Sequence, residues 1–257
     1  MFIGKRVILA AILAVAPFSL HAQTITVGVA ANFSTPLSEI ITKFQTANPG
    51  YYVTTTSKST GQLQADIIAG GTSGPYDLFL AANAASPIYL HDYYSSLVVG
   101  DVFTYAQGYL ELWSNKSGVD ISAGLPTNFT KTVIANVPNA PYGVAASQIL
   151  AADPYYVELP DSRVDQKSDI TATYNSVADG TYDYGFVAKS QICLNGSFSG
   201  VSHHSYTSGY DAIIQDGIKI NRTARTSGEN TVLAAFVTYL QTSLGAGDTI
   251  TKYCYTR

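Results

Sequence analysis

Small and polar residues follow three predicted strands at the points where helices begin, at 32–34, 59–61 and 141–143. The first residues of a helix carry backbone N–H groups with no helical acceptor and lie at the positive end of the helix dipole. The carboxyl ends of parallel strands also meet at one edge of a sheet. The three junctions therefore suit an anion. Each one taken alone is more typical of an ordinary helix cap, and the three together indicate only a candidate anion site, so the residues by themselves leave both interpretations open.

Motifs for catalysis are missing from the sequence. It has no Gly-x-Ser-x-Gly elbow, no phosphate-binding Walker loop, no Gly-x-Gly-x-x-Gly and no His-Glu-x-x-His. The histidines beyond His21 are His91, His203 and His204, and we expect the adjacent pair to lie in a solvated loop. A secreted hydrolase is therefore a weak alternative.

The elements that position the junctions are strands alternating with helices. Ile25–Ala30 is apolar on both alternations, and Leu37, Ile40, Ile41 and Phe44 then follow at helical spacing. Further strands are expected at 51–56, 76–81, 108–113, 132–136 and 183–188, and further helices at 143–152 and 231–244. This order predicts an α/β protein with parallel, doubly wound sheets.

The N-terminus is predicted to be a signal peptide over residues 1–22. Lys5 and Arg6 precede an apolar stretch from Val7 to Leu20, which is shorter than the ~20 residues of a membrane-spanning helix. Loss of the two basic residues changes the formal net charge from −4 to −6, so nucleic acid is not an expected partner. With 46% hydrophobic and 12% charged residues, the rest should be well packed, as one large domain or two smaller ones.

Cys193 and Cys254 are the only cysteines. In an exported protein an isolated pair is expected to form a disulfide rather than a metal site.

Several stretches resemble, in order, those of periplasmic molybdate-binding proteins, the ModA family. They are ITVGVAANFSTPL at 25–37, the Ser-Thr-Gly turn at 59–61, YDLFLAAN at 76–83, IANVPNAPYG at 134–143, DYGFVAKSQ at 183–191, YDAIIQD at 210–216 and the ending at 252–255. The resemblance covers nearly the whole chain after residue 22.

The resemblance implies a type II periplasmic-binding-protein fold, in which two α/β lobes are joined by a hinge of two crossing strands. The first lobe would comprise 23–107 plus 213–257, and the second 108–212. It also implies a monomeric, non-enzymatic periplasmic protein that passes its ligand to an inner-membrane ABC permease. The ligand would be molybdate or tungstate, with no further cofactor and no direct bond from the protein to molybdenum.

The family pattern places ligand-binding residues at Asn32, Thr60, Tyr142 and Ile170. It implies that Asn32 gives its backbone N–H and its amide, that Thr60 gives a hydroxyl and an N–H, and that Tyr142 and Ile170 give N–H groups. Ser59 and Ala188 are expected neighbours, and Ala188 stands where some relatives have an anion-binding tyrosine. Lys189 is expected to be solvated.

Other oxyanions remain alternatives, namely sulfate or a phosphorylated small molecule. A surface adhesin on the same fold is a further alternative. Molybdate and sulfate are fully ionised at neutral pH and only accept hydrogen bonds, which fits a site without Asp or Glu. Monoprotonated phosphate would need an acceptor for its proton and is disfavoured.

Overall fold

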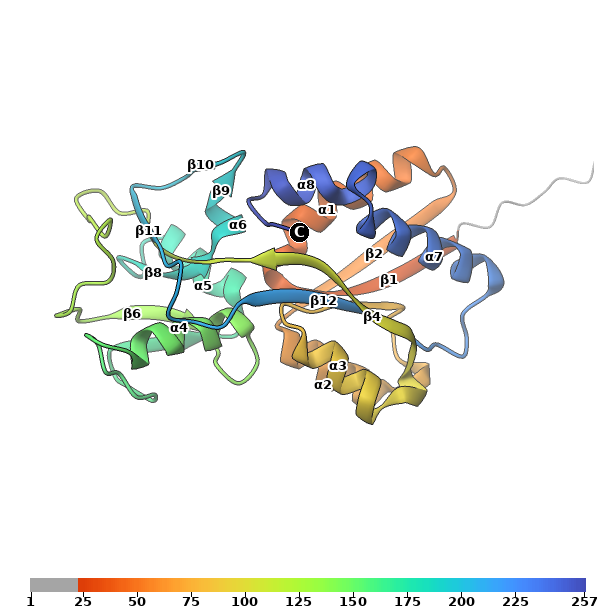
Figure 1. The fold of residues 1–257 in the computed structure, drawn as a ribbon, viewed down its shortest axis with the longest axis horizontal. Helices are drawn as coiled ribbons and strands as arrows, with labels where there is room; N and C mark the ends of the chain where they lie inside the picture. Colours follow the sequence, from red (N-terminus) through yellow and green to blue (C-terminus); the bar gives the residue numbers. More distant parts are fainter. Residues whose placement is uncertain (1–22) are drawn as a thin grey trace, which may run out of the picture.

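The computed structural model describes residues 23–257, so the predicted signal peptide lies outside the described residues. Two five-stranded sheets form two lobes side by side along the long axis of the molecule (Figure 1). Within the described part of the chain, no helix is long and apolar enough to cross a membrane. The expected α/β class with two lobes is confirmed.

The first lobe is built on a sheet with strand order β2-β1-β3-β12-β4. Its strands are β1 (Gln23–Ala30), β2 (Tyr51–Lys58), β3 (Leu78–Leu80), β4 (Val98–Gly108) and β12 (Ile213–Ile220). β1 runs parallel to β2 and β3, whereas β12 is antiparallel to β3 and β4. The sheet is therefore mixed, not wholly parallel as predicted, because β12 returns from the second lobe in the opposite direction.

Helices cover both faces of this sheet (Figure 1). α1 (Ser34–Ala47), α7 (Ser227–Gln241) and α8 (Asp248–Lys252) lie over one face, and α2 (Thr60–Gly70) and α3 (Ala85–Tyr93) over the other. The predicted apolar stripe of α1 is buried against the sheet. Short helical turns complete the lobe: η1 (Ala31–Phe33), η2 (Gly71–Ser73), η3 (Ser95–Leu97) and η4 (Ser243–Gly247).

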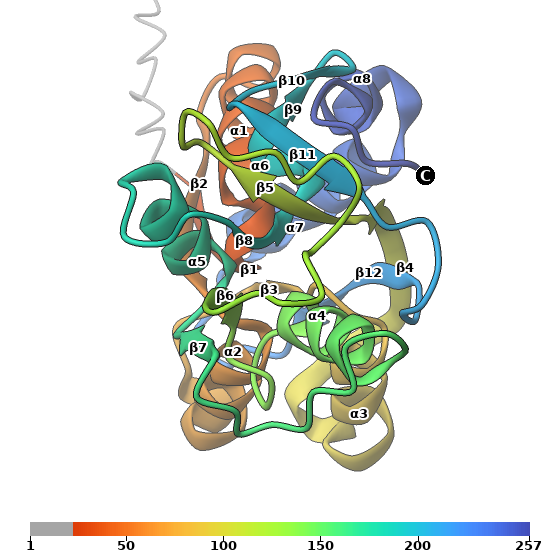
Figure 2. The same ribbon diagram turned by 90° about the vertical axis from the view of Figure 1, so that its left-hand side faces the viewer.

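The second lobe has the strand order β11-β5-β8-β6-β7. Its strands are β5 (Leu110–Ser114), β6 (Thr132–Ala135), β7 (Val164–Lys167), β8 (Gly185–Ala188) and β11 (Ser202–Ser205). α4 (Pro141–Ala151) and α5 (Ile170–Ala178) pack on opposite faces (Figure 2). α6 (Lys189–Ile192) leads into a small hairpin of β9 (Cys193–Leu194) and β10 (Ser197–Phe198).

The histidine pair does not lie in a loop as predicted. His203 and His204 form part of β11 and pair with Trp113 and Leu112 of β5. The rings of His203 and Phe198 stack with centroids 3.8 Å apart, so packing as well as solvent surrounds this histidine.

Three segments connect the lobes. The chain leaves the first sheet where β4 ends at Gly108 and enters the second at Leu110, and it returns between the end of β11 and the start of β12. The third connection is the C-terminal tail, because a disulfide joins Cys254, beyond α8, to Cys193, with Cα atoms 5.9 Å apart. The exact lobe boundaries proposed from the sequence stay a prediction.

Candidate functional site

Four helical N-termini meet where the two sheets face each other. From the first lobe come η1, which leads into α1, and α2, and from the second lobe α4 and α5. Hydrogen bonds across the lobes show how close they are. Gly61 N–H donates to Asn139 O at 2.9 Å, and the Thr171 hydroxyl donates to Ala31 O at 3.2 Å. The positive ends of the helix dipoles therefore face one shared region.

The predicted ligand residues occupy the helix positions whose N–H groups have no acceptor within their own helix. Thr60 and Ile170 are the first residues of α2 and α5, and Tyr142 is the second residue of α4. In α5, the two N–H groups after that of Ile170 already have an acceptor, because the Asp169 carboxylate accepts those of Thr171 and Ala172 at 2.9 Å. The capping pattern thus leaves the N–H of Ile170 for a ligand.

The two hydroxyls at the start of α2 have different roles. Ser59 Oγ donates to Gln62 Oε1 at 2.9 Å, so this hydroxyl is used within the helix cap. Thr60 Oγ1 instead accepts the N–H of Ala82 at 3.0 Å and keeps its own hydrogen to donate. Thr60 is only 2% exposed. Of the two, Thr60 is the residue able to donate a hydroxyl hydrogen bond to an anion.

Asn32 belongs to a set of buried polar side chains that we call the hinge network: Asn32, Tyr142, Ser190, Gln215 and Tyr255. The Asn32 amide donates to Gln215 Oε1 at 3.0 Å and to Tyr255 Oη at 2.9 Å. Both of its hydrogens are therefore used inside the protein, which differs from the expected role of the amide as a ligand donor. The backbone N–H of Asn32 is the donor that remains.

The hinge network connects the lobes through neutral groups. Tyr255 Oη donates to Asn32 O at 2.9 Å and accepts from Ser190 Oγ at 2.8 Å. Burial raises the pKa of Tyr255 to about 12 and raises the pKa of Tyr142 well above its ordinary value. Both phenols consequently stay uncharged around neutral pH and add no negative charge next to an anion site.

Ala188 and Lys189 are placed differently from the ligand residues. The N–H of Ala188 donates to Gln191 Oε1 at 2.9 Å, so it serves the cap of α6. Lys189 is partly buried, with 28% of its side chain exposed, so it is less solvated than predicted. Its ammonium lies 5.5 Å from the ring centre of Tyr109 and 5.4 Å from that of Phe198, and 4.0 Å from Glu111 Oε1.

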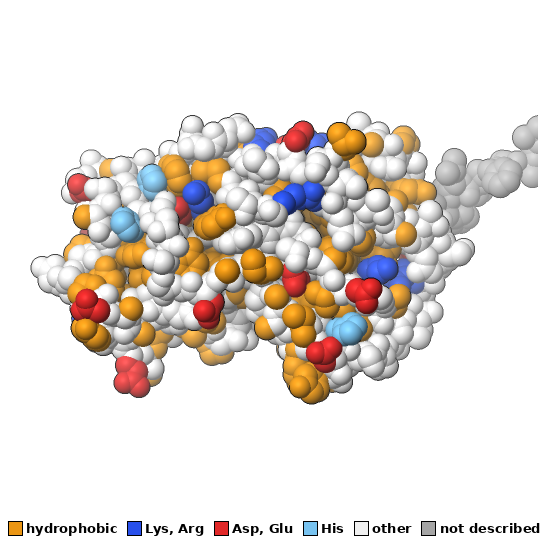
Figure 3. Space-filling view, viewed as in Figure 1, with side chains coloured by type: hydrophobic (Ala, Val, Ile, Leu, Met, Phe, Trp, Pro, Cys, Tyr) orange, Lys and Arg blue, Asp and Glu red, His pale blue; other side chains and the backbone are white. Residues whose placement is uncertain are grey.

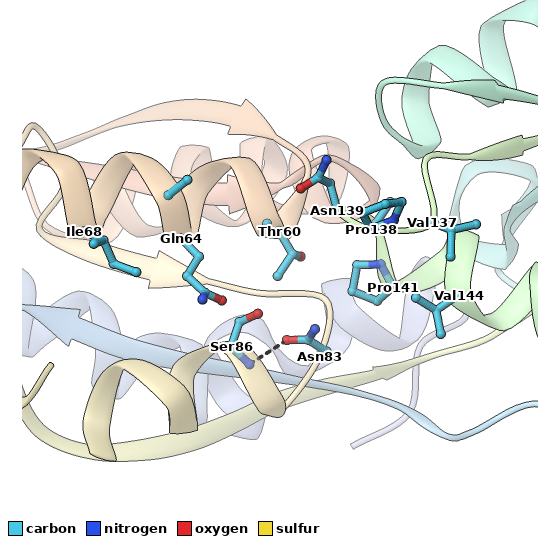
Figure 4. A pocket seen from close by; sticks show the side chains of 13 residues that line it. Thr60, Gln64, Ile68, Asn83, Ser86, Val137, Pro138, Asn139, Pro141 and Val144 are labelled. Carbon is cyan, nitrogen blue, oxygen red and sulfur yellow. Dashed lines mark hydrogen bonds between the residues drawn. The ribbon is translucent and has the colours of Figure 1, made fainter. Parts of the chain in front are cut away.

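A groove of about 330 Å³ reaches Thr60 from the surface between α2 and the loop before α4 (Figure 4). Val137, Pro141 and Val144 border it from the second lobe, opposite Gln64 and Ile68. None of the described residues that line it is charged. Charged side chains are scattered over the face shown in Figure 3. Of the four predicted ligand residues, Thr60 alone is among those that line this groove, and a ligand in it would meet neutral side chains.

Sequence reasoning did not single out Gln215, Tyr255, Ser190 or Asn139. Gln215 carried one available signal, because it is a polar residue directly after the apolar pair Ile213 and Ile214 in a buried strand. Buried polar groups require partners. That signal indicates an internal hydrogen bond without showing to which residue.

The two lobes, the hinge strands and the helix N-termini that approach one another between the lobes are the architecture of a clamp-type binding protein. Residues 25–255 match the model of the family described as bacterial extracellular solute-binding protein. The chain belongs to this family and, within it, to the molybdate-binding ModA proteins.

Two curated relatives and one solved structure support this membership. The chain is 35% identical over 225 residues to the molybdate-binding protein ModA of Azotobacter vinelandii, covering 86% of this chain and 85% of that protein. It is 34% identical over 230 residues to the protein of the same name from Rhodobacter capsulatus, which covers 88% of this chain and 86% of that protein. The structure of the Azotobacter vinelandii periplasmic molybdate-binding protein superposes with a TM-score of 0.79 at 27% identity, covering 91% of this chain and 99% of that one.

Proposed function

We propose that this protein binds molybdate or tungstate between its lobes in the periplasm and delivers it to an ABC permease in the inner membrane. The observation that carries the proposal is the approach of helix N-termini from both lobes, seen in the bonds from Gly61 N–H to Asn139 O and from Thr171 Oγ1 to Ala31 O, beside a groove with a neutral lining. The names of the relatives, which are molybdate-binding and in one case periplasmic, support the same conclusion.

The donors fit a fully ionised oxyanion. Backbone N–H groups of Asn32, Thr60, Tyr142 and Ile170, together with the Thr60 hydroxyl, would supply five hydrogen bonds. At ~1.5–3 kcal/mol for each bond to a charged group, these give roughly 7–15 kcal/mol before the costs of desolvation and ordering. Micromolar to nanomolar binding needs about 8–12 kcal/mol. No counter-ion, cofactor or bond from the protein to the metal is required.

The same donors disfavour two of the alternatives, a protonated phosphate and a hydrolase. Phosphate carrying a proton would need an acceptor, and none of the four proposed donor residues is Asp or Glu. A hydrolase would need an activated nucleophile. The Thr60 hydroxyl instead accepts a backbone N–H and has no basic side chain among its hydrogen-bond partners. We therefore propose binding without turnover, by a monomer.

Calorimetric titration of the purified, ligand-stripped protein tests the proposal. We expect one-to-one binding of molybdate and of tungstate, with weak or no heat from sulfate and phosphate. Preferential binding of sulfate would leave the clamp in place and overturn the choice of ligand. Absence of heat with all four anions would overturn the function.

Thr60→Val tests the assignment of the site because it removes the hydroxyl and preserves the side-chain shape. Loss of one charge-assisted bond of ~1.5–3 kcal/mol should raise the Kd for molybdate roughly 10- to 150-fold. Thr46→Val is the matched control, since its exposed hydroxyl bonds only to Thr42 O within α1. Equal affinities of the two variants would contradict the assignment.

A further inference from the structure

Gln215 touches predicted ligand residues from both lobes. It lies on β12, one of the two strands that connect the lobes, and is fully buried. Its Oε1 accepts from the Asn32 amide at 3.0 Å, and its Nε2 donates to Tyr142 Oη at 3.1 Å. One carboxamide therefore joins the end of β1 in the first lobe to the start of α4 in the second.

The backbone of the hinge passes so close to this contact that residue 108 has no space for a side chain. A Cβ atom on Gly108, the last residue of β4, would lie 2.5 Å from Gln215 Nε2 and would also overlap the Tyr142 hydroxyl. Such distances are not sterically allowed, so the bond between Gln215 and Tyr142 depends on a glycine at the hinge. The contact is thus fixed by the hinge strand on one side and by α4 on the other.

We propose that Gln215 is a positioning residue for oxyanion binding, which couples the ligand-binding N–H groups of Asn32 and Tyr142 without touching the anion itself. This inference rests on the proposed function. The bond from Gln215 to Tyr142 crosses between the lobes and favours the arrangement in which both N–H groups face one ligand. If only a fraction of the molecules adopts the binding-competent arrangement, the apparent Kd rises in inverse proportion to that fraction.

Tyr142→Phe tests the coupling directly. It removes the hydroxyl that accepts from Gln215 and leaves the backbone N–H of residue 142, the predicted ligand donor, in place. We expect the Kd for molybdate to rise about 3- to 10-fold, the value of one neutral hydrogen bond, through a faster dissociation rate. Calorimetry gives the Kd, and stopped-flow displacement of molybdate gives the rate.

Tyr105→Phe is the matched control for a purely structural effect. The single hydrogen of the Tyr105 hydroxyl is shared between Ala81 O at 2.9 Å and Gln215 Oε1 at 3.0 Å, both acceptors lie in the first lobe, and Tyr105 is as buried as Tyr142. Tyr105 lies on β4, however, and β4 pairs with β12 in the same sheet, so this bond does not cross between the lobes. The Tyr105 variant should show a lower melting temperature and an unchanged Kd.

The outcomes separate the two proposals. If wild-type protein binds none of the anions, the proposed function fails, whatever the variants do. If wild type binds molybdate and Tyr142→Phe binds it equally tightly, or if Tyr105→Phe weakens binding to the same extent, the positioning role of Gln215 is overturned. Gln215→Leu, where it folds, should combine with Tyr142→Phe to give less than the sum of the two effects on Kd, because both changes remove the bond between Gln215 and Tyr142 and only Gln215→Leu also removes the bond to Asn32.

Discussion

Two regions join the lobes of this protein through different kinds of contact. The hinge network is buried and consists of side-chain hydrogen bonds that connect η1, β12, α4, α6 and the C-terminal tail. On the side of the groove, the lobes meet through the backbone bond from Gly61 N–H to Asn139 O, which we call the rim contact. The hinge network depends on specific side chains, whereas the rim contact depends on the close approach of two backbone segments, one from each lobe.

This difference indicates which region opens. Side chains at the hinge have several partners each and lie next to a disulfide, so separating them costs many bonds. The rim contact is a single bond beside a groove lined by small and neutral residues. We therefore expect entry of the proposed ligand to break the rim contact, together with the bond from Thr171 Oγ1 to Ala31 O, and to leave the hinge side joined. Three changes test this comparison.

Removing the disulfide should have the largest effect. Cys193 and Cys254 are 61 residues apart in sequence, and the loss of a cross-link that closes such a loop lowers the free energy of unfolding by about 4 kcal/mol. The double variant Cys193→Ala/Cys254→Ala, compared with oxidised wild type by urea denaturation, measures this. An unchanged midpoint would show that hydrogen bonds alone hold the hinge side.

Gly61→Ala should break the rim contact. A Cβ on residue 61 would lie 2.7 Å from Asn139 Oδ1 and 3.0 Å from Asn139 Cα, so full closure would be blocked. Overpacking costs ~1–3 kcal/mol, which corresponds to a Kd for molybdate raised roughly 5- to 150-fold. Because Ala favours helices over Gly, the melting temperature of the variant should not fall.

Gly70→Ala provides the control for that experiment. It is the same substitution in the same helix, and its Cβ would meet only Pro75 Cδ, at 3.9 Å. We expect its Kd to match that of wild type. If both glycine variants bind as wild type does, the rim contact has no part in closure.

The smallest effect concerns the anchorage of the C-terminal tail. Hydrogen bonds from Lys252, at 2.8 Å, and from Lys43 lower the pKa of Glu39 to about 2. Since the folded pKa is depressed, this stabilisation is present above the unfolded pKa of ~4.3 and is lost as the pH falls towards 2. Glu39→Gln should therefore lose less stability than wild type over this range.

Thermal melts between pH 5 and 2 measure this change, which should be below about 1 kcal/mol because the pair is partly exposed. Lys252→Met should reproduce most of it, since Lys252 is the main cause of the shift. Lys43→Met should change the pH dependence less, because the hydrogen bond from Lys43 is the smaller cause of the lowered pKa of Glu39. Lys43 also donates to Thr249 Oγ1 of α8 at 2.7 Å, so its loss should lower stability at all pH values in this range. A larger effect of Lys43→Met than of Lys252→Met on the pH dependence would contradict the assignment of Lys252 as the main partner.

The sequence predicted the elements well where burial follows a simple period. All four residues of the predicted stripe in α1 are buried, and β1 ends at Ala30 as expected. The last long helix was predicted at 231–244 and instead spans Ser227–Gln241. The available signal was the capping box of Thr226 and Glu229, whose carboxylate accepts the N–H of Thr226 at 2.7 Å.

The polar contacts could not be predicted in the same way. Asn32 and Gln215 are 183 positions apart, and Gln215 and Tyr142 are 73 apart, so no local pattern links them. The Ser-Thr-Gly turn at 59–61 was enough to predict that Thr60 lies at the start of a helix. The use of the Asn32 amide inside the protein depends on how three distant segments pack.

The order of strands also determines when each lobe can form during folding. The second sheet uses only residues 110–205, whereas the first needs β12 between β3 and β4. Contacts between distant parts of a chain form slowly, because closing a long loop costs entropy before the contact is gained. The second lobe can therefore fold from one continuous segment, whereas the sheet of the first lobe is complete only when β12 has paired with β3 and β4. Cys254 follows the last helix of the first lobe and Cys193 lies in the second, so the native pairing of the cysteines requires segments from both lobes to come together.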